Sequence, residues 1–190
     1  MSFDFVAARE NMIEGQVRTS DVTDAALVGA MRRVDRHTLC SPDQAVVAYA
    51  DRELPIAPGV WLMRPREAAK LLQAVSARPG EHGLCIGAPY LAAVLEEMGL
   101  TVDSREAGLA RDVEPNAYDL IVSEASVVEA PQSWLDGLRP FGRLAVVVRR
   151  GLVGHATVWR RGPDTLSRRE MFDASPPYLA GFEPAPAFSF

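Results

Sequence analysis

The stretch Gly83–Tyr90 has residue types that could bind a negatively charged group. Gly83 to Ile86 is apolar enough for a buried strand, and Gly87 follows it just before a predicted helix. The first N–H groups of a helix have no partner within that helix, so a glycine turn there lets an anion approach the backbone. A single glycine also suits an ordinary turn between strand and helix, and we favour this simpler interpretation of Gly87.

Two further polar positions could complete such a site. Glu106 lies about twenty residues after Gly87, where a carboxylate at the end of the next strand can hold the hydroxyls of a ribose. It is equally well explained as a solvated loop carboxylate. Ser123 and Glu124 follow the predicted strand Tyr118–Val122, where they could line a cleft at the carboxyl ends of parallel strands or cap a helix.

The segment from Asp51 to Met63 is predicted to contain a loop with site character. Prolines and a glycine interrupt Leu54–Gly59, and they remove hydrogen-bond donors and break regular structure. Asp51 is either a substrate-loop residue or a cap at the end of a helix. Trp61, Leu62 and Met63 either belong to the core, the commoner case, or form an exposed apolar patch that recruits a partner.

Cysteine, histidine and metal chemistry are not indicated. Cys85 lies on a predicted buried strand without a neighbouring histidine, and we interpret it as a small core residue. Cys40 and Cys85 form no CxxC motif, which suits a reducing compartment. The three histidines have neither metal-ligand nor triad spacing, so no metal site is predicted.

The composition is that of a folded globular protein of one domain. The 190 residues include 20 basic and 25 acidic ones, and the net charge of −5 argues against a general nucleic-acid binder. Lys70 is the only lysine, which we interpret as the base composition of a GC-rich bacterial genome. No apolar run reaches the roughly 20 residues that cross a bilayer, and no signal peptide is evident, so we expect a cytoplasmic protein that does not engage membranes.

Periodicity predicts helices that alternate with strands after two opening helices. Strands separated by helices at this spacing form a parallel sheet, and the two final strands around Gly162–Asp164 form an antiparallel edge. The predicted helices are 4–17, 23–34, 42–49, 65–78, 91–98 and 134–138, and the predicted strands are 83–86, 100–102, 118–122, 143–148, 156–161 and 167–172.

Several short motifs together resemble the protein-L-isoaspartate O-methyltransferase family. Ala48–Asp51 followed by Leu54–Ile56 is the most specific of them, and the match extends over most of the chain. The others are Met12 with Gln16–Arg18, Asp21–Asp24, Ala30–Val34, Tyr118–Val122 and Leu138–Leu144.

The resemblance implies an α/β protein with the Rossmann-like fold of S-adenosylmethionine-dependent methyltransferases. Expected are a mostly parallel sheet, an antiparallel C-terminal edge and an N-terminal helical cap. A single domain then spans 1–190, with the cap and site loop at 1–60, the Rossmann-like core at 61–154, and a hairpin and tail at 155–190. Only eleven residues separate Glu106 from Tyr118, so we predict that the usual third strand is absent.

The resemblance also implies site residues, and the sequence departs from the family's pattern there. Cys85 stands where an acidic residue is expected, only Gly87 remains of a Gly-x-Gly turn, and Trp61–Pro65 replaces a hydroxyl-rich acceptor segment. We predict that Pro89 or Tyr90 fills the cofactor cleft. The implied cofactor is S-adenosylmethionine, with binding candidates Gly87, Glu106 and Ser123, and the substrate-loop candidates are Asp51, Leu54, Pro55 and Ile56.

Three functions follow as hypotheses. The first is a degenerate family member that acts as a binding or scaffolding module for a protein partner, with a homodimer through the N-terminal helices or the site loop as one form. The second is an active methyltransferase that acts on isoaspartyl carboxylates in damaged proteins, since orientation alone carries much of such a transfer. The third is a pocket reused for a different small molecule. Another subunit that completes the short region before Tyr118 is compatible with any of these.

Overall fold

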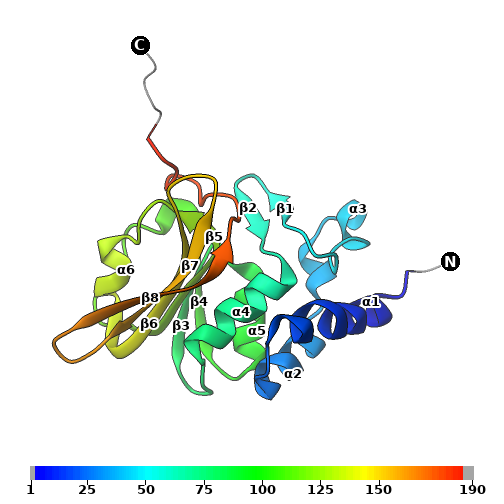
Figure 1. Ribbon diagram of the computed structural model, residues 1–190, viewed down its shortest axis with the longest axis horizontal. Coiled ribbons are helices and arrows are strands. Elements are labelled where there is room, and N and C mark those ends of the chain that lie inside the picture. Colours follow the sequence, from blue (N-terminus) through cyan, green and yellow to red (C-terminus); the bar gives the residue numbers. More distant parts are fainter. Residues whose placement is uncertain (1–2, 186–190) are drawn as a thin grey trace, which may run out of the picture.

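The computed structural model describes residues 3–185 and places six strands in one mixed sheet, with helices against both faces (Figure 1). The strand order is β4-β3-β5-β6-β7-β8, in which the first four strands are parallel and the last two form an antiparallel hairpin. This confirms the predicted sheet. Its strands are β3 (His82–Ile86), β4 (Thr101–Arg105), β5 (Tyr118–Val127), β6 (Leu138–Arg149), β7 (Gly154–Arg161) and β8 (Leu166–Ala174).

Two helices open the chain, which confirms the predicted helical cap at its N-terminus. Each begins at an aspartate whose side chain accepts hydrogen bonds from the first turn. The carboxylate of Asp4 accepts a hydrogen bond from the amide of Ala7, and Asp24 accepts from Ala26 and Leu27. The α-helices are α1 (Phe5–Met12), α2 (Ala25–Arg33), α3 (Pro42–Ala45), α4 (Pro65–Val75), α5 (Pro89–Glu97) and α6 (Gln132–Asp136). The π-helix η1 (Ile13–Val17) and the 3₁₀ helices η2 (Arg18–Ser20), η3 (Arg36–Leu39) and η4 (Ala107–Leu109) complete the helical elements.

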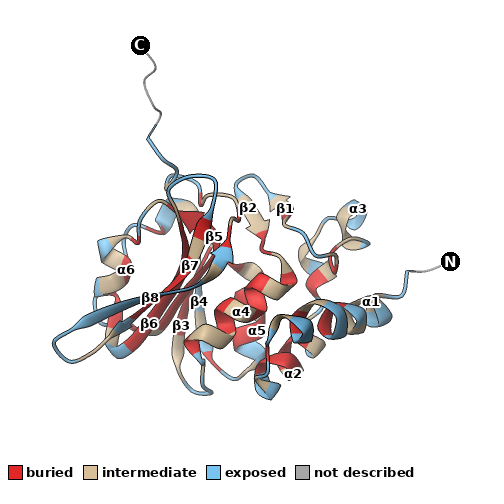
Figure 2. Ribbon diagram, viewed as in Figure 1, coloured by how far each residue is buried: buried red, intermediate tan, exposed pale blue. Residues whose placement is uncertain are grey.

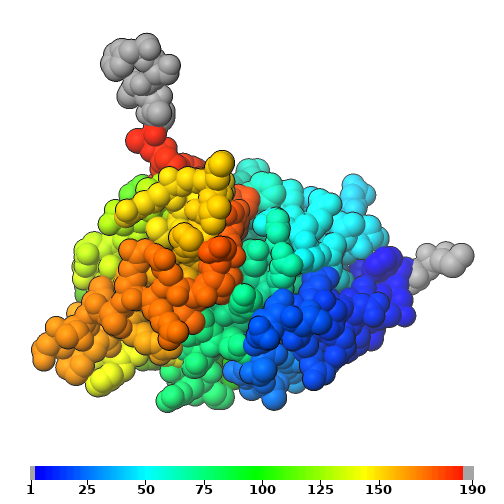
Figure 3. Space-filling model, in the orientation of Figure 1, coloured from blue at the N-terminus to red at the C-terminus, as the bar shows by residue number. Residues whose placement is uncertain are grey.

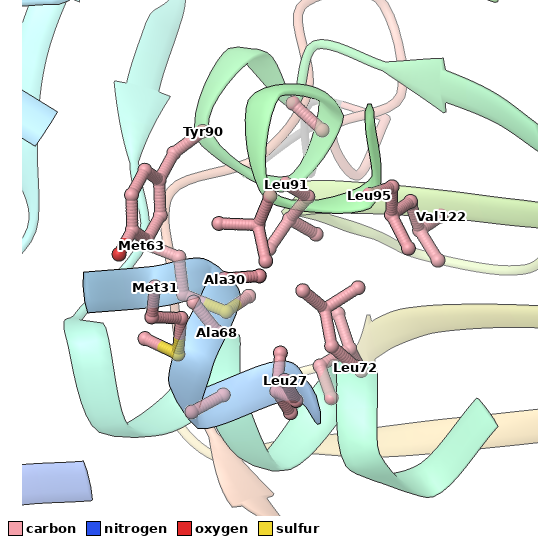
Figure 4. Packing of buried hydrophobic residues seen from close by; sticks show 14 of the residues in the cluster. Leu27, Ala30, Met31, Met63, Ala68, Leu72, Tyr90, Leu91, Leu95 and Val122 are labelled. Atoms are coloured by element: carbon pink, nitrogen blue, oxygen red, sulfur yellow. The ribbon is translucent and has the colours of Figure 1, made fainter. Parts of the chain in front are cut away.

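Each face of the sheet has its own hydrophobic cluster (Figure 2). The first cluster joins the N-terminal helices to α4, α5 and one side of β3, β5, β6 and β7, and Figure 4 shows part of it around Met31, Met63 and Leu91. The second cluster lies under α6 and includes Trp134 and Leu179. Central strands buried on both faces read as nearly continuous apolar runs, as Leu144–Val148 of β6 does.

The predicted loop Leu54–Gly59 is wrong in part. Strand β1 (Leu54–Ala57) pairs antiparallel with β2 (Val60–Leu62), and Gly59 makes the tight turn with φ of +73°. Proline is tolerated in this two-stranded ribbon because an edge position leaves its missing N–H without consequence. The hairpin therefore holds the predicted substrate-loop residues in regular structure.

Strand β5 continues five residues beyond its predicted end, so Ser123 and Glu124 lie inside the strand and not after it. The pairing with β6 shifts register between Val122 and Ser126, where the polar residues are accommodated. Sequence rules end a buried strand at polar residues, and here internal hydrogen bonds satisfy those residues instead.

The predicted absence of the third strand is confirmed for the described chain. Between Arg105 and Tyr118 the backbone forms only the short helix η4, and β4 is the edge of the sheet. Ala110 and Val113 from this connection pack into the second cluster. The short segment thus covers one face of the sheet without extending it.

Candidate functional site

The carboxylate of Glu124 lies at the N-terminus of α5, the helix that follows Gly87. Its Oε1 accepts hydrogen bonds from the backbone amides of Tyr90 at 2.8 Å and Leu91 at 3.0 Å. Its Oε2 accepts a hydrogen bond from the amide of Met63 at 2.8 Å. A helix N-terminus attracts negative charge through its free N–H groups and its dipole, and here the chain's own glutamate occupies that place.

A buried arginine shares this environment with Glu124. The guanidinium of Arg36 donates to the carbonyl oxygens of Ala48 at 2.8 Å and Met63 at 2.5 Å, and it lies 4.5 Å from the centre of the Tyr90 ring. Burial raises the pKa of Glu124, whereas Arg36 and the three amide donors oppose that rise. Together these groups form a fully buried polar network behind the first turn of α5.

Tyr90 is fully buried in the first cluster, next to Met63 (Figure 4). Burial raises the pKa of its hydroxyl, and this oxygen has no hydrogen-bond partner among the described residues. Pro89 occupies the first turn of the helix, where a missing N–H costs nothing. The side chain of Tyr90 therefore takes up interior space directly behind the Gly87 turn.

Gly87 is covered by the C-terminal segment. Its φ of +55° lies in the left-handed region, and a Cβ added there would come 2.7 Å from Cδ1 of Leu179. The segment is held by backbone bonds from Ser126 N to Pro177 O at 2.9 Å and from Leu179 N to Ser126 O at 2.8 Å. Leu179 is buried on top of the turn as a result.

The three cofactor candidates come from neighbouring strands. The register pairs Ile86 of β3 with Ser123 of β5, and the amide of Gly87 donates to the carbonyl of Arg105 at 2.9 Å, directly before Glu106. Glu106 is exposed, whereas Ser123 is fully buried and its hydroxyl accepts from the amide of Ala125. The parallel strands bring these three positions close together, but of the three only Glu106 has an exposed side chain.

The substrate-loop candidates are divided between surface and core. Asp51 is exposed and forms an ion pair with Arg66 at 3.0 Å, so it does not cap a helix. Leu54 is fully buried at the start of β1, and Pro55 and Ile56 continue that strand half-buried. Of the adjacent residues with two open interpretations, Leu62 and Met63 belong to the core and Trp61 is half-buried.

A second cluster of charges lies at the start of α4. Glu53 pairs with Arg64 at 2.8 Å, and Glu67 is buried with one carboxylate oxygen that has no hydrogen-bond partner among the described residues. Burial raises the pKa of Glu67 to about 6, Arg64 opposes the rise, and Glu53 adds to it.

Among the clefts of residues 3–185, five with volumes of 250–360 Å³ are lined by residues other than Gly87, Glu106 and Ser123. Residues 3–185 also contain no cluster of histidine, cysteine, aspartate or glutamate suited to a metal ion. In the same range, no helix has the length and apolarity needed to span a membrane. Cys85 is fully buried, and burial raises its pKa, as expected for a core residue.

Sequence reasoning missed Arg36 and Leu179 as neighbours of this region. Arg36 lies among charged residues and carries no motif, so no local signal identifies it. Leu179 stands in a proline-rich tail, where an isolated large apolar residue was the available signal for a docking contact.

No family model matches the chain. Curated relatives do: a protein-L-isoaspartate O-methyltransferase of Methylorubrum populi is 32% identical over 86% of this chain and 91% of its own length. Protein-L-isoaspartate O-methyltransferase 1 of Rhodopseudomonas palustris is 33% identical over 76% of this chain and 70% of its own length.

Two solved structures have a similar fold. One is a Plasmodium falciparum protein named as a β-aspartate methyltransferase, in complex with S-adenosyl-L-homocysteine; it has a TM-score of 0.71 and 15% identity, over 90% of this chain and 97% of that one. The other, named protein-L-isoaspartate O-methyltransferase, also has a TM-score of 0.71, with 17% identity over 91% of this chain and 66% of that one.

Proposed function

Because this chain belongs to the protein-L-isoaspartate O-methyltransferase family, we propose that it is a member that binds a protein partner and does not carry the family's cofactor. The family is S-adenosylmethionine-dependent, and Gly87 with the first turn of α5 is our proposed counterpart of its cofactor site. The observation that carries the proposal is the carboxylate of Glu124 at this turn, hydrogen-bonded to Tyr90, Leu91 and Met63.

The contacts of Glu124 support the proposal because a bound ligand carboxylate would compete with this side chain for the same backbone amides. A ligand carboxylate that used the first amides of α5 would displace the Glu124 side chain from two of its three donors. The displaced group is fully buried beside Arg36, so moving it breaks these hydrogen bonds and leaves a buried carboxylate without its donors. Binding would have to compensate for that loss before any affinity appeared.

Leu179 provides independent support. It covers the glycine whose lack of a side chain would let a ligand approach the backbone, and its amide is bonded to Ser126. The residues present therefore do not fit the family's cofactor while Leu179 covers Gly87 and Glu124 occupies the first turn of α5.

Methyl transfer to isoaspartyl carboxylates is the second candidate function. The similarity to curated methyltransferases over nine-tenths of a relative's length favours it, as does the exposed carboxylate of Glu106 beside Gly87. This function needs the Leu179 segment to leave Gly87 and Glu124 to release the first turn of α5.

We propose a second copy of the chain as one form of the protein partner. The N-terminal cap exposes large apolar side chains, among them Phe3, Val6 and Val46. Burial of such side chains between two copies is the usual source of affinity in homodimers. Analytical ultracentrifugation of the purified protein tests this point separately from cofactor binding.

The proposal is tested by calorimetric titration of the purified protein with S-adenosylhomocysteine. We expect no saturable heat from the wild-type chain. A Leu179→Ala variant uncovers Gly87, and Leu152→Ala is the matched control, because Leu152 is 89% exposed and lies in a loop of another part of the chain.

Saturable wild-type binding that Glu106→Ala abolishes would overturn the proposal and favour the methyltransferase. An isoaspartyl-peptide methylation assay would then follow. Binding by the Leu179→Ala variant alone would identify the C-terminal segment as the element that closes the site, and would leave the wild-type chain a non-binder.

A further inference from the structure

A cleft of about 250 Å³ lies at the amino ends of the parallel strands, the opposite end of the sheet from Gly87. It is bounded by the end of α4, by Arg78 and Glu81 before β3, and by the turn Arg139–Gly142 within β6. This site shares no residue with the Gly87 region, so the S-adenosylhomocysteine titration does not bear on it. A docking site here specifies where the protein partner of the proposed function binds, and in that respect it rests on the proposed function.

Phe141 in this turn is not explained by the fold. Its φ of +67° lies in the left-handed region, which costs a residue with a bulky side chain about 1–2 kcal/mol. The side chain is 72% exposed, so its burial contributes little free energy to offset the cost of the positive φ. The turn is fixed by its neighbour, since a Cβ on Gly142 would meet the carbonyl oxygen of Arg139 at 2.8 Å. An outlier of this kind is a reason to look for a function of the side chain.

The arginines around Phe141 divide into two sets. Arg143 is buried, and its guanidinium donates hydrogen bonds to the Glu81 carboxylate and the Val75 carbonyl. Arg139 forms an ion pair with Asp119 at 2.9 Å. Arg143 thus joins the turn to the end of α4 with all three of its guanidinium nitrogens bonded, and the charge of Arg139 is paired with that of Asp119.

Arg78 and Arg160 form the second set. Both line the cleft, and no carboxylate among the described residues pairs with either guanidinium. Three arginines, Arg78, Arg143 and Arg160, line the cleft with Glu81 and Asp119, which gives the lining a local charge of +1 on a chain whose net charge is −5. Within residues 3–185 the guanidinium of Arg160 donates only to the carbonyl of Ala74 at 3.1 Å, and exposed aromatic rings and arginines are both enriched at protein interfaces.

We infer that this cleft docks an acidic segment of a partner protein, whose apolar side chain packs on Phe141 while its carboxylates meet Arg78 and Arg160. The positive charge of the cleft favours a negatively charged partner segment and speeds its association. The aromatic ring supplies the contact area. The strained phenylalanine is then a binding residue maintained at the expense of the turn.

The test uses a short fluorescein-labelled oligo-glutamate peptide that carries one leucine, with fluorescence anisotropy as the measurement. Wild-type protein should bind it saturably, and binding should weaken as salt is raised. Phe141→Gly should weaken binding by about tenfold or more, while its melting temperature stays equal or rises, because glycine relieves the positive φ. Arg78→Glu should weaken binding by a similar factor.

Leu152→Gly is the matched control, since it also removes an exposed large apolar side chain and should leave binding unchanged. The inference is overturned if wild-type protein does not bind the peptide or if Phe141→Gly binds it as well as wild type does. Equal binding of a single-stranded DNA oligonucleotide would also overturn it, because the cleft would then recognise any polyanion.

Discussion

Glu124 is the residue on which the first turn of α5 depends. Its carboxylate satisfies three backbone amides in the interior, and each amide left without an acceptor costs about 1–3 kcal/mol. Glu124→Ala also leaves Arg36 without its anionic neighbour. Since breaking a buried polar network of this kind costs about 3–5 kcal/mol, we expect a loss of that size in urea-induced unfolding.

Glu129→Ala is the control for this loss. Glu129 lies in the loop after β5, its side chain is 78% exposed, and it meets Arg150 at 3.6 Å, so removing it should change the free energy of unfolding by less than about 0.5 kcal/mol. Glu124→Gln keeps one acceptor oxygen, so its loss in the free energy of unfolding should lie between those of Glu124→Ala and Glu129→Ala. A Glu124→Ala loss below about 1 kcal/mol would mean that the network contributes little.

Glu67 predicts a pH dependence of stability. Burial raises its pKa from 4.5 to about 6, so the protonated form is favoured in the folded state. The stability that this provides is complete below about pH 4.5 and is lost as the pH rises through about 6. Solvent screening reduces the effect. At neutral pH the free energy of unfolding of Glu67→Gln should therefore exceed that of wild type by about 1 kcal/mol.

The measurement is the free energy of unfolding of both proteins at about pH 4 and about pH 7. The advantage of the glutamine variant should vanish at the lower pH, where wild-type Glu67 is itself neutral. An advantage of the same size at both pH values would assign the gain to packing and contradict the role of charge.

At the scale of residues, the sequence identified the positions near Gly87 but not their contacts. Gly87, Glu106 and Ser123 could be placed together because parallel strands end at one edge of a sheet. The bond from Met63 to Glu124 spans 61 positions, and the contact of Leu179 with Gly87 spans still more, so neither leaves a local pattern. Whether these candidates bind anything stays a prediction.

At the scale of elements, the helices were the most predictable part. Their caps and apolar spacing are local signals, as at Asp24 and along α4. The hairpin β1–β2 and the end of β5 were not predictable in the same way. Pro55 and the polar residues Ser123 and Glu124 contradict strand rules locally, and pairing partners elsewhere in the fold override those rules.

The C-terminal segment after β8 acts as an element although, as far as residue 185, its regular structure is one β-bridge between Ser126 and Tyr178. Leu179 is its buried anchor, and Phe182 packs on Trp134 with a ring separation of 5.6 Å. Leu179→Ala should therefore cost about 2–4 kcal/mol in urea-induced unfolding, the range for a buried leucine. Leu152→Ala, at an exposed position, should cost almost nothing, and similar losses for both variants would contradict the anchoring role.

At the scale of the whole molecule, the N-terminal cap has no core of its own. Met12, Leu27 and Met31 of the cap share one cluster with α4 and α5, which also cover the sheet. In Figure 3 the blue N-terminal helices and the orange hairpin lie on opposite sides of the displayed face, with the segment of α4 between them. The predicted boundary near residue 60 therefore divides the sequence without dividing the hydrophobic interior.

This arrangement predicts one cooperative unfolding transition. The three tryptophans lie at positions 61, 134 and 159, so their fluorescence reports on the β1–β2 hairpin, α6 and the six-stranded sheet, whereas far-UV circular dichroism also reports on the cap helices. Because the cap and α4 bury each other's apolar side chains, both signals should change at the same urea concentration. A loss of helical signal at lower urea than the fluorescence change would mean that the cap unfolds separately, and that its packing on α4 contributes little to the stability of the sheet.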